Sequence, residues 1–426
     1  MFSPLRKPVS ASAKAGSAFS RVTALAELRP LHEAFRWLHL NGQRMLRWQA
    51  ELIAIPAPPF GEAARSAWMA EQFQAAGLGR VWTDSIGNVF AEFGPEAAEN
   101  KPVVLLSAHL DTVFPASTPL EPRLEGDRLE GPGACDNGAG VIGMLGIVHA
   151  LVQAKMPVGA TLVFVGNVGE EGEGDLRGVR RIYRDSEYAG RVAAHVVLDG
   201  AGAETAVTQA LGSRRFQVTV TGPGGHSFTD AGRPNPILVL SLALGKLAEI
   251  SLEKWNDGAR TTMNVGTIAG GTSVNTIPES ATASVDFRST DREALVSLEV
   301  ALHRAVEDAV ETVPDRRSLR YSIETIGDRP AAELPANSPL LEALRAVDRH
   351  LGLRTDLRLG STDANIPLSL GVPAISLGAG GDGGGAHTRG EWYSAVGREM
   401  GLRRVLLLTL AMLELAGEQN PASDLG

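Results

Sequence analysis

Residues 103–111 read VVLLSAHLD. A short run of apolar residues with several branched side chains is typical of a β-strand that is buried on both faces. The run ends in His109 and Asp111, with one residue between them. Alternate side chains of a strand point to the same face, so we expect the imidazole and the carboxylate to point the same way. The stretch therefore predicts a buried strand whose carboxyl end carries a polar pair.

The segments around this strand predict an α/β fold. Apolar runs at 160–171 (ATLVFVGNVGEE) and 194–200 (AHVVLDG) are predicted strands, and 140–155 is a predicted helix that follows a glycine-rich turn. Residues 25–55 have the apolar spacing of one or two amphipathic helices, and 80–94 have the pattern of a hairpin. Strands that alternate with helices predict a mainly parallel, mixed sheet flanked by helices.

The character of the sequence changes near residue 209. From there the segments read as strand, helix, two strands, helix and strand, beginning with SRRFQVTVTGPGG at 213–225 and ending with RYSIETI at 320–326. This β-α-β-β-α-β order predicts a ferredoxin-like α+β domain, a small sheet with two helices on one face. The α/β pattern returns afterwards, so we expect the smaller domain to be inserted into the larger one.

These changes divide the chain into four parts. The larger domain is predicted to consist of 25–209 and 326–426, and the inserted lid domain of 210–325. Residues 1–24 are expected to form an N-terminal arm, disordered or loosely docked. The first 21 residues carry four basic side chains, no acidic one and no continuous apolar segment. A transit-like role for this arm is left open.

Composition limits the partners and the compartment. The chain has 426 residues, 44% of them hydrophobic, and a formal net charge of -9. These values are typical of a soluble globular protein and argue against nucleic acid or an anionic membrane as the main partner. Cys135 is the only cysteine, which excludes an intramolecular disulfide. A single cysteine fits a reducing cytoplasm, so we predict a cytoplasmic protein and leave a periplasmic location open. No stretch reaches the length of about 20 apolar residues of a membrane span.

Acidic and imidazole side chains follow several of the predicted strands or lie in the turns between elements. They are His109, Asp111, Asp136, Glu170, Glu171, Asp199 and His387. In open α/β sheets, ligands bind at the carboxyl ends of the strands. One histidine or one Glu–Glu pair at such a place is more often structural. A whole set of them behind apolar runs is difficult to explain as independent accidents.

Carboxylates that are brought together without a counter-charge repel one another and regain their protons. A divalent metal removes this conflict, and two histidines with three carboxylates suit zinc, with cobalt or manganese as substitutes. Two ions that share one carboxylate can activate a water molecule between them for hydrolysis. A further carboxylate, outside the ligand set, is then needed to accept the proton of that water.

In its order along the chain, this set resembles the co-catalytic zinc hydrolases of the M20 metallopeptidase family. The resemblance extends from about residue 40 to the C-terminus. It implies two zinc ions per subunit, with Asp136 as the bridging ligand. It implies that the remaining ligands are divided between the two ions, with His109 and Asp199 on one and Glu171 and His387 on the other.

The resemblance also implies roles for the residues beside the ligands. Glu170 would be the general base that deprotonates the bridging water. Asp111 would accept the second ring N–H of His109 and so orient this ligand. A cis peptide bond is implied between Asp136 and Asn137.

In the inserted domain, GPGGHSF at 222–228 is similar to the lid motif of the family. The resemblance implies a homodimer formed through this domain, in which His226 reaches the partner's active site and helps to stabilise the oxyanion. Asn275 would assist it, and Arg288 would bind a substrate carboxylate. Without the resemblance, these three are interpreted as a turn residue, a loop cap and a charge on the surface of a sheet.

Residues 360–378, GSTDANIPLSLGVPAISLG, are similar to the tripeptidase-like branch of the family, which also more often has aspartate at position 199. The similarity implies a substrate pocket near the α-amino end of a peptide, lined by Ser361, Thr362, Asp363 and Asn365. A carboxylate such as Asp363 opposite a free amine would select exopeptidase substrates. Asp363 also suits the N-terminus of a helix.

The leading hypothesis is a metal-dependent exopeptidase that hydrolyses small peptides with Glu170 as general base. The runner-up is an amidohydrolase or deacylase that cleaves an N-acyl or N-carbamoyl amino acid with the same residues. A third hypothesis is a metal-binding protein without turnover. It is disfavoured because metal binding needs ligands alone, whereas a base such as Glu170 is needed for chemistry.

Overall fold

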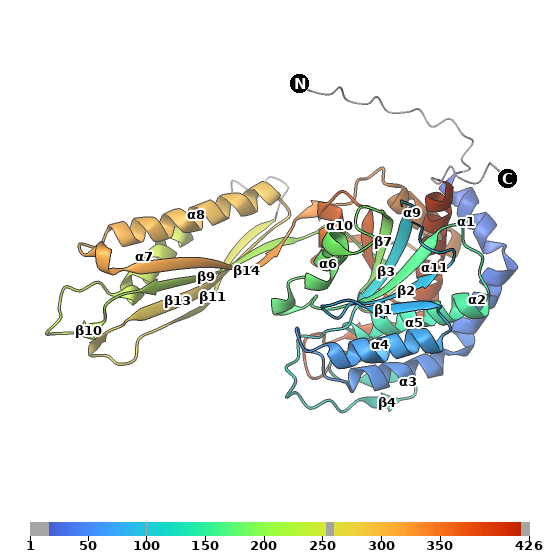
Figure 1. The fold of residues 1–426 in the computed structure, drawn as a ribbon, viewed down its shortest axis with the longest axis horizontal. Helices are drawn as coiled ribbons and strands as arrows, with labels where there is room; N and C mark the ends of the chain where they lie inside the picture. Colours follow the sequence, from blue (N-terminus) through green and yellow to red (C-terminus); the bar gives the residue numbers. More distant parts are fainter. Residues whose placement is uncertain (1–16, 99, 253–259, 419–426) are drawn as a thin grey trace, which may run out of the picture.

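A computed structural model describes residues 17–98, 100–252 and 260–418. Figure 1 shows a large body built around a sheet and an elongated body that extends away from it. The chain passes from the large body into the elongated one and returns, so the second body is an inserted domain. The predicted α/β fold with an inserted α+β domain is confirmed.

The larger domain is built on a sheet that, over the described residues, has nine strands. The order is β1-β2-β6-β3-β7-β17-β8-β15, with β16 beside β8. The central neighbours β6, β3, β7 and β17 run parallel, and antiparallel pairs lie on either side of them. The strands are β1 (Arg80–Thr83), β2 (Val89–Phe93), β3 (Val103–His109), β6 (Thr161–Asn167), β7 (Val192–Leu198), β8 (Thr205–Ala210), β15 (Ala332–Glu333), β16 (Asp356–Gly360) and β17 (Ala374–Leu377).

Helices flank this sheet (Figure 1). They are α1 (Ala18–Ala26), α2 (Arg29–Leu40), α3 (Gly42–Ile53), α4 (Ala63–Ala75), α5 (Gly138–Gln153), α6 (Arg177–Asp185), α9 (Pro339–Leu351), α10 (Asn365–Ser369) and α11 (Arg398–Glu418). Both α5 and α11 contact β3 and β7, and α4 contacts β1 and β2. Among the described helices, none combines the length and the apolar character that crossing a membrane requires.

Strand β3 is buried along its whole length, as its sequence predicts. Val104 and Leu106 belong to the main core, which includes side chains of α5 and α11. The alternate residues Val103 and Leu105 belong to a second core with Ile182 of α6. The strand is apolar throughout because each of its faces packs against a different core.

The predicted N-terminal arm is wrong over its described part. Residues 1–16 lie outside the described residues, but Ala18–Ala26 form α1, which contacts α9 and α11. Val22 and Leu25 are buried in the main core. The apolar residues of this segment have helical spacing, so the segment packs on the domain as a helix.

The inserted domain is an antiparallel sheet with two helices on one face (Figure 1). Its strands are β9 (Gly212–Thr221), β11 (Thr261–Gly270), β13 (Ser280–Ser289) and β14 (Arg320–Arg329), in the order β11-β13-β9-β14. Helices α7 (Pro236–Ala248) and α8 (Arg292–Glu311) pack on β9 and β13. The sheet extends to Arg329, so the predicted boundary at residue 325 falls inside β14.

Two small sheets complete the structure. One has the order β18-β19-β5-β4, and the other pairs β10 with β12 in the inserted domain. Their strands are β4 (Arg123–Glu125), β5 (Arg128–Glu130), β10 (Gly225–His226), β12 (Thr276–Ile277), β18 (Asp382–Gly384) and β19 (Trp392–Ser394). Short 3₁₀ turns lie at Gly172–Gly174 and Arg316–Ser318.

Candidate metal centre

The topology of the sheet brings the polar strand ends together. His109 ends β3, Glu170 and Glu171 follow β6, and Asp199 follows β7. These strands are neighbours and run parallel, so their carboxyl ends lie at one edge of the sheet. Asp136 joins them from the turn before α5, and His387 from the loop between β18 and β19.

Among the described residues, the ligand-type side chains form three groups, and two of these share Asp136. His109, Asp136 and Asp199 are one group, and Asp136, Glu171 and His387 are the other, each with its ligand atoms within 4.8 Å of one another. The two oxygens of Asp136 face different histidines. Oδ1 lies 3.2 Å from His109 Nε2, and Oδ2 lies 3.1 Å from His387 Nε2. These two groups contain the residues that the resemblance assigns to the two ions, and the assignment itself stays a prediction.

The spacing of these atoms fits a pair of divalent cations. Zinc ligands lie about 2.0–2.2 Å from the ion, so two atoms of a tetrahedral set are about 3.4 Å apart. His109 Nε2 lies 3.8 Å from Asp199 Oδ1, and His387 Nε2 lies 3.1 Å from Glu171 Oε1. Asp136 Oδ1 is buried and has no hydrogen-bond partner among the described residues. An unpartnered carboxylate oxygen beside a histidine nitrogen is what a cation would satisfy.

Electrostatics in the cluster favour positive charge. The hydrogen bond to Asp136 raises the pKa of His387 to about 9. Burial would lower the pKa of His109, but the surrounding carboxylates outweigh burial and raise this pKa well above its usual range. Burial raises the pKa of Glu171 to about 7. Protons or divalent cations can supply the positive charge that the carboxylates attract.

Asp111 has a different set of contacts from the one the resemblance implies. His109 Nδ1 lies 3.1 Å from the main-chain oxygen of Asp111 and 3.6 Å from its Oδ1, so the closer acceptor for the ring N–H is the carbonyl group. The carboxylate instead accepts the main-chain N–H groups of Glu170 and Glu171, at 3.0 and 2.7 Å. Asp111 therefore orients the ring with its backbone and holds the Glu170–Glu171 turn with its side chain.

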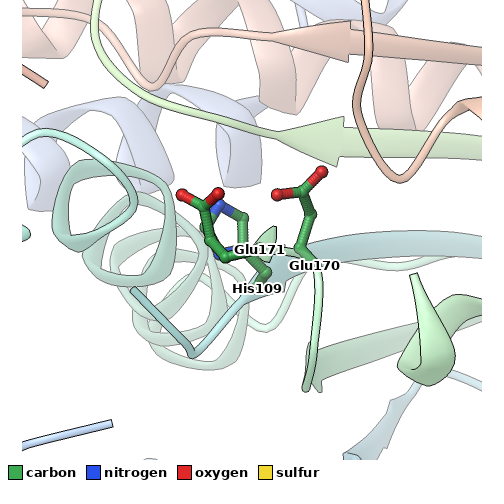
Figure 2. Close-up of side chains that lie close together, drawn as sticks. All are labelled: His109, Glu170 and Glu171. Carbon is green, nitrogen blue, oxygen red and sulfur yellow. The ribbon is translucent and has the colours of Figure 1, made fainter. Parts of the chain in front are cut away.

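Glu170 lies beside the two groups that share Asp136 and belongs to neither. Figure 2 shows the carboxylate of Glu171 close to the ring of His109. The carboxylate of Glu170 lies farther from this ring. Ligand-type atoms of these three residues are nevertheless within 4.8 Å of one another. Glu170 is buried, which raises its pKa well above the usual range, while Arg329 opposes that shift.

Glu391, which the sequence did not single out, and Asn137 support the turn that carries Asp136. The buried carboxylate of Glu391 accepts the main-chain N–H groups of Gly133, Cys135 and Asp136. Asn137 caps α5 with Oδ1, which accepts the N–H of Gly140 at 3.0 Å. The peptide bond between Asp136 and Asn137 is cis, as the resemblance implies.

Strand β10, which carries His226, lies at the far end of the inserted domain (Figure 1). His226 is on β10 and pairs with Thr276 of β12, and the carbonyl oxygen of Asn275 accepts the N–H of Ser227 at 3.0 Å. The structure thus brings His226 and Asn275 together but places them away from the metal cluster of the same chain. Arg288 lies on β13, where its Nε donates to Asp286 Oδ2 at 2.7 Å.

The segment around α10 contains both a buried acid and a structural amide. Asp363 is buried, accepts a hydrogen bond of 2.6 Å from Asn167, and has an Oδ1 atom without a partner among the described residues. Burial raises its pKa to about 6.

Asn365 is correctly placed near this acid but does not present free polar atoms. Its Nδ2 donates to the carbonyl groups of Leu211 and Pro330, at 2.9 and 3.0 Å, and its Oδ1 accepts the N–H of Thr362. Leu211 and Pro330 are the points at which the chain enters and leaves the inserted domain. Asn365 therefore holds this connection, and its place in a substrate pocket stays a prediction.

The cluster offers ligand-type side chains that could hold metal ions, as a metal-dependent hydrolase requires. A family model described as peptidase family M20/M25/M40 matches residues 105–411. The chain belongs to this peptidase family, and it is a hydrolase that acts on peptide or amide bonds.

The names of individual relatives refer to different activities. A Mycobacterium tuberculosis protein named for succinyl-diaminopimelate desuccinylase, DapE, is 31% identical over 350 residues, which cover 80% of this chain and 91% of the relative. A tripeptidase from Staphylococcus aureus has a similar structure, with a TM-score of 0.71, 22% identity, and coverage of 88% of this chain and 99% of its own. Aminopeptidase PepT from Bacillus cereus gives a TM-score of 0.69 at 18% identity, with coverage of 88% and 99%.

Proposed function

We propose that the protein is a metal-dependent exopeptidase that hydrolyses small peptides, with two divalent cations, zinc first among them, in each subunit. The observation that carries the proposal is the sharing of Asp136 by two groups of ligand-type side chains, with Glu170 beside them. His109 and Asp199 would hold one cation, and Glu171 and His387 the other. When bound, the cations would supply Lewis acidity for the attacking water and for the carbonyl of the scissile bond.

Side chains of this chain carry out the proton transfer and the positioning that the reaction also requires. Glu170 accepts the proton of the attacking water and later gives it to the leaving amine, as a general base and then a general acid. The carboxylate of Asp111 fixes the positions of Glu170 and Glu171 by accepting their main-chain N–H groups. Burial of Asp111, Glu170 and Glu171 keeps bulk water from these side chains and strengthens their interactions.

We assign His226 to the active site of a partner subunit. Its Nδ1 accepts the N–H groups of Phe228 and Thr229, at 3.2 and 3.3 Å, so the neutral ring carries its proton on Nε2. Such a ring can donate to the oxyanion that forms at the substrate carbonyl. Phe228 is 84% exposed and Val274 is fully exposed beside it, which suits burial against a second copy of the chain. Asn275 would assist His226.

The free α-amine of a peptide would be recognised near α10. Asp363 has an unpartnered buried oxygen, and its negative charge contributes to the raised pKa of Glu170. An ammonium group with three N–H donors would satisfy such an oxygen. Ser361 and Thr362 belong to the same turn. Arg288, which is half-exposed in the inserted domain, would bind the carboxylate at the other end of the substrate.

A second candidate is the cleavage of N-acyl or N-carbamoyl amino acids. It is favoured by the similarity to the Mycobacterium tuberculosis relative, whose name refers to removal of a succinyl group. Both reactions hydrolyse an amide bond and use the same cluster. They differ in whether the substrate presents a free amine or a blocked one.

One panel of substrates separates the two candidates. The zinc-loaded protein is incubated with di- and tripeptides, with the same peptides carrying an N-acetyl group, and with N-acetyl, N-succinyl and N-carbamoyl amino acids, and products are measured by mass spectrometry. Faster cleavage of peptides with a free amine supports the exopeptidase. Cleavage of the blocked substrates alone supports the deacylase and rejects the assignment of Asp363.

A cytoplasmic location stays a prediction that cell fractionation would test.

A further inference from the structure

Arg329 joins the inserted domain to Glu170. It is the last residue of β14, the strand by which the chain leaves the lid sheet. Its Nη1 donates to Glu170 Oε1 at 2.9 Å, and its Nη2 donates to the main-chain oxygen of Glu170. Both side chains are only 7% exposed. A guanidinium that binds the carboxylate and the carbonyl group of one residue constrains its side chain and its backbone together.

The backbone that presents Arg329 is fastened to the larger domain on both sides. Nη1 of Arg329 also donates to Ser361 Oγ at 3.1 Å. The N–H of Asp328 donates to Asp175 Oδ1 at 3.1 Å, and the carbonyl group of Pro330 accepts from Asn365. The guanidinium is therefore presented from a defined position rather than from a loose loop end.

These contacts divide the carboxylate of Glu170 into a held oxygen and a free one. Arg329 takes Oε1, and no hydrogen bond to Oε2 is found among the described residues. A general base must direct one unoccupied oxygen toward the proton that it accepts. With Oε1 fixed and the backbone clamped, Oε2 has a defined direction.

We propose that Arg329 is a positioning residue that sets the orientation of Glu170 and links it to the exit strand of the lid domain. The proposal rests on the proposed function, in which Glu170 is the base. Because β14 belongs to the lid sheet, a rotation of the lid acts directly on the residue that holds the base. Arg329 itself does not touch the substrate in this role.

A double-mutant cycle tests the proposal. The wild type, Arg329→Gln, Glu170→Gln and the double variant are compared with the panel substrate that is cleaved fastest, after the metal content of each has been measured. We expect Arg329→Gln to lower kcat about 10- to 100-fold through lost orientation, with little change in KM. Arg329→Lys should restore part of the rate. In the Glu170→Gln background, the Arg329→Gln change should have almost no further effect, because its target is already gone.

Arg177→Gln is the matched control. Arg177 is a half-buried arginine near the same turn, and it forms an ion pair with Glu62 at 2.7 Å. Within the described part of the chain, its side chain makes no hydrogen bond to Glu170. Its kcat is expected to stay close to that of the wild type. Hydrogen exchange of the metal-free proteins adds a readout without turnover. Arg329→Gln should speed exchange in residues 169–175, and Arg177→Gln should do so less.

Three results would overturn the proposal. An unchanged kcat in Arg329→Gln would show that the contact does not serve the reaction. A rise in KM alone would show that Arg329 binds substrate. An equal loss in both backgrounds would show that it acts through another residue. If Glu170→Gln is as active as the wild type, the proposed function fails, and unchanged exchange at 169–175 would then reject the positioning role as well.

Discussion

The carboxylate of Glu391 accepts the main-chain N–H of Asp136 at 2.7 Å. The same carboxylate accepts the N–H groups of Gly133 and Cys135, and its side chain is fully buried. One acid outside the proposed ligand set thus organises the turn that presents Asp136, which we propose the two cations share. Support of this kind from beyond the ligands is a general requirement for a precise metal site.

Removal of this carboxylate should weaken both the fold and the metal site. Glu391→Ala leaves three buried N–H groups without an acceptor, at about 1–3 kcal/mol of unfolding free energy each. Glu391→Gln keeps one acceptor oxygen and should lose less. Chemical denaturation and elemental analysis of bound zinc measure the two effects. Glu130→Gln, an exposed acid on the neighbouring strand β5, is the control. Wild-type stability and zinc content in Glu391→Ala would contradict this role.

Replacement of Glu170 should separate metal binding from turnover. Glu170→Gln keeps the shape of the side chain and removes its basicity, so we expect zinc content and fold to be retained while kcat falls about 10²- to 10⁴-fold. Glu173→Gln, an exposed acid in the same turn, should behave like the wild type. Steady-state kinetics on the best panel substrate, with zinc measured in parallel, provide the check. Near-normal turnover in Glu170→Gln would reject the general-base assignment.

Local patterns were sufficient to predict the elements that position the site. The apolar stretch at 103–109 is a strand buried on both faces, and β3 has this burial at every residue. The order of strands and helices indicated a parallel centre, which places His109, Glu170 and Asp199 at one edge of the sheet. For these residues, the position in the fold follows from the end of the element to which each belongs.

The supporting residues could not be found in this way, because their contacts join distant parts of the chain. Glu391 is 255 residues from Asp136, and Arg329 is 159 residues from Glu170. No periodicity or spacing in the sequence marks such pairs. The orientation of His109 by Asp111 was predicted, but the contacts of the Asp111 carboxylate with the Glu170–Glu171 turn were not, since the N–H groups that it accepts become neighbours only when β3 and β6 pair. The positions followed from local sequence, whereas the hydrogen-bond network needed the structure.

Metal affinity should rise with pH up to about 9. The pKa of His387 is raised to about 9 by Asp136, and that of Glu171 to about 7 by burial. Each must lose its proton to bind a cation, so the apparent affinity of their site should rise about tenfold per pH unit between pH 7 and 9, and more steeply below pH 7. Chelator competition with zinc from pH 6 to 9 measures this slope. An affinity that does not change over this range would contradict the prediction.

Stability of the metal-free protein should change in the opposite direction. A group whose pKa is higher in the native state than in the unfolded state stabilises the fold while it is protonated. This contribution is complete at a pH below the unfolded-state pKa, and it is lost as the pH rises through the native-state pKa. The window runs from 6.5 to about 9 for His387 and from 4.5 to about 7 for Glu171. The Tm of the protein in a chelator should therefore fall from pH 5 to 9. Excess zinc should reduce or reverse that trend, and a rising Tm in the chelator would contradict it.

Two inactive variants should restore activity when they form a mixed dimer. Glu170→Gln lacks the base and His226→Ala lacks the lid histidine, which we assign to the partner's site. In a mixed dimer, one of the two sites receives Glu170 from one chain and His226 from the other. Random exchange of subunits should therefore recover about a quarter of wild-type activity per chain.

The control for this experiment is His303→Ala, which removes an exposed histidine of α8 in the same domain. It should be active alone, so the loss in His226→Ala would be specific to the lid tip. Sedimentation of the same mixtures shows whether dimers form and exchange. Substitution of Phe228 or Val274 by serine should weaken dimers, if the exposed apolar tip packs on the partner. A monomer with full activity, or mixed dimers without recovered activity, would reject the assignment of His226 to the partner's site.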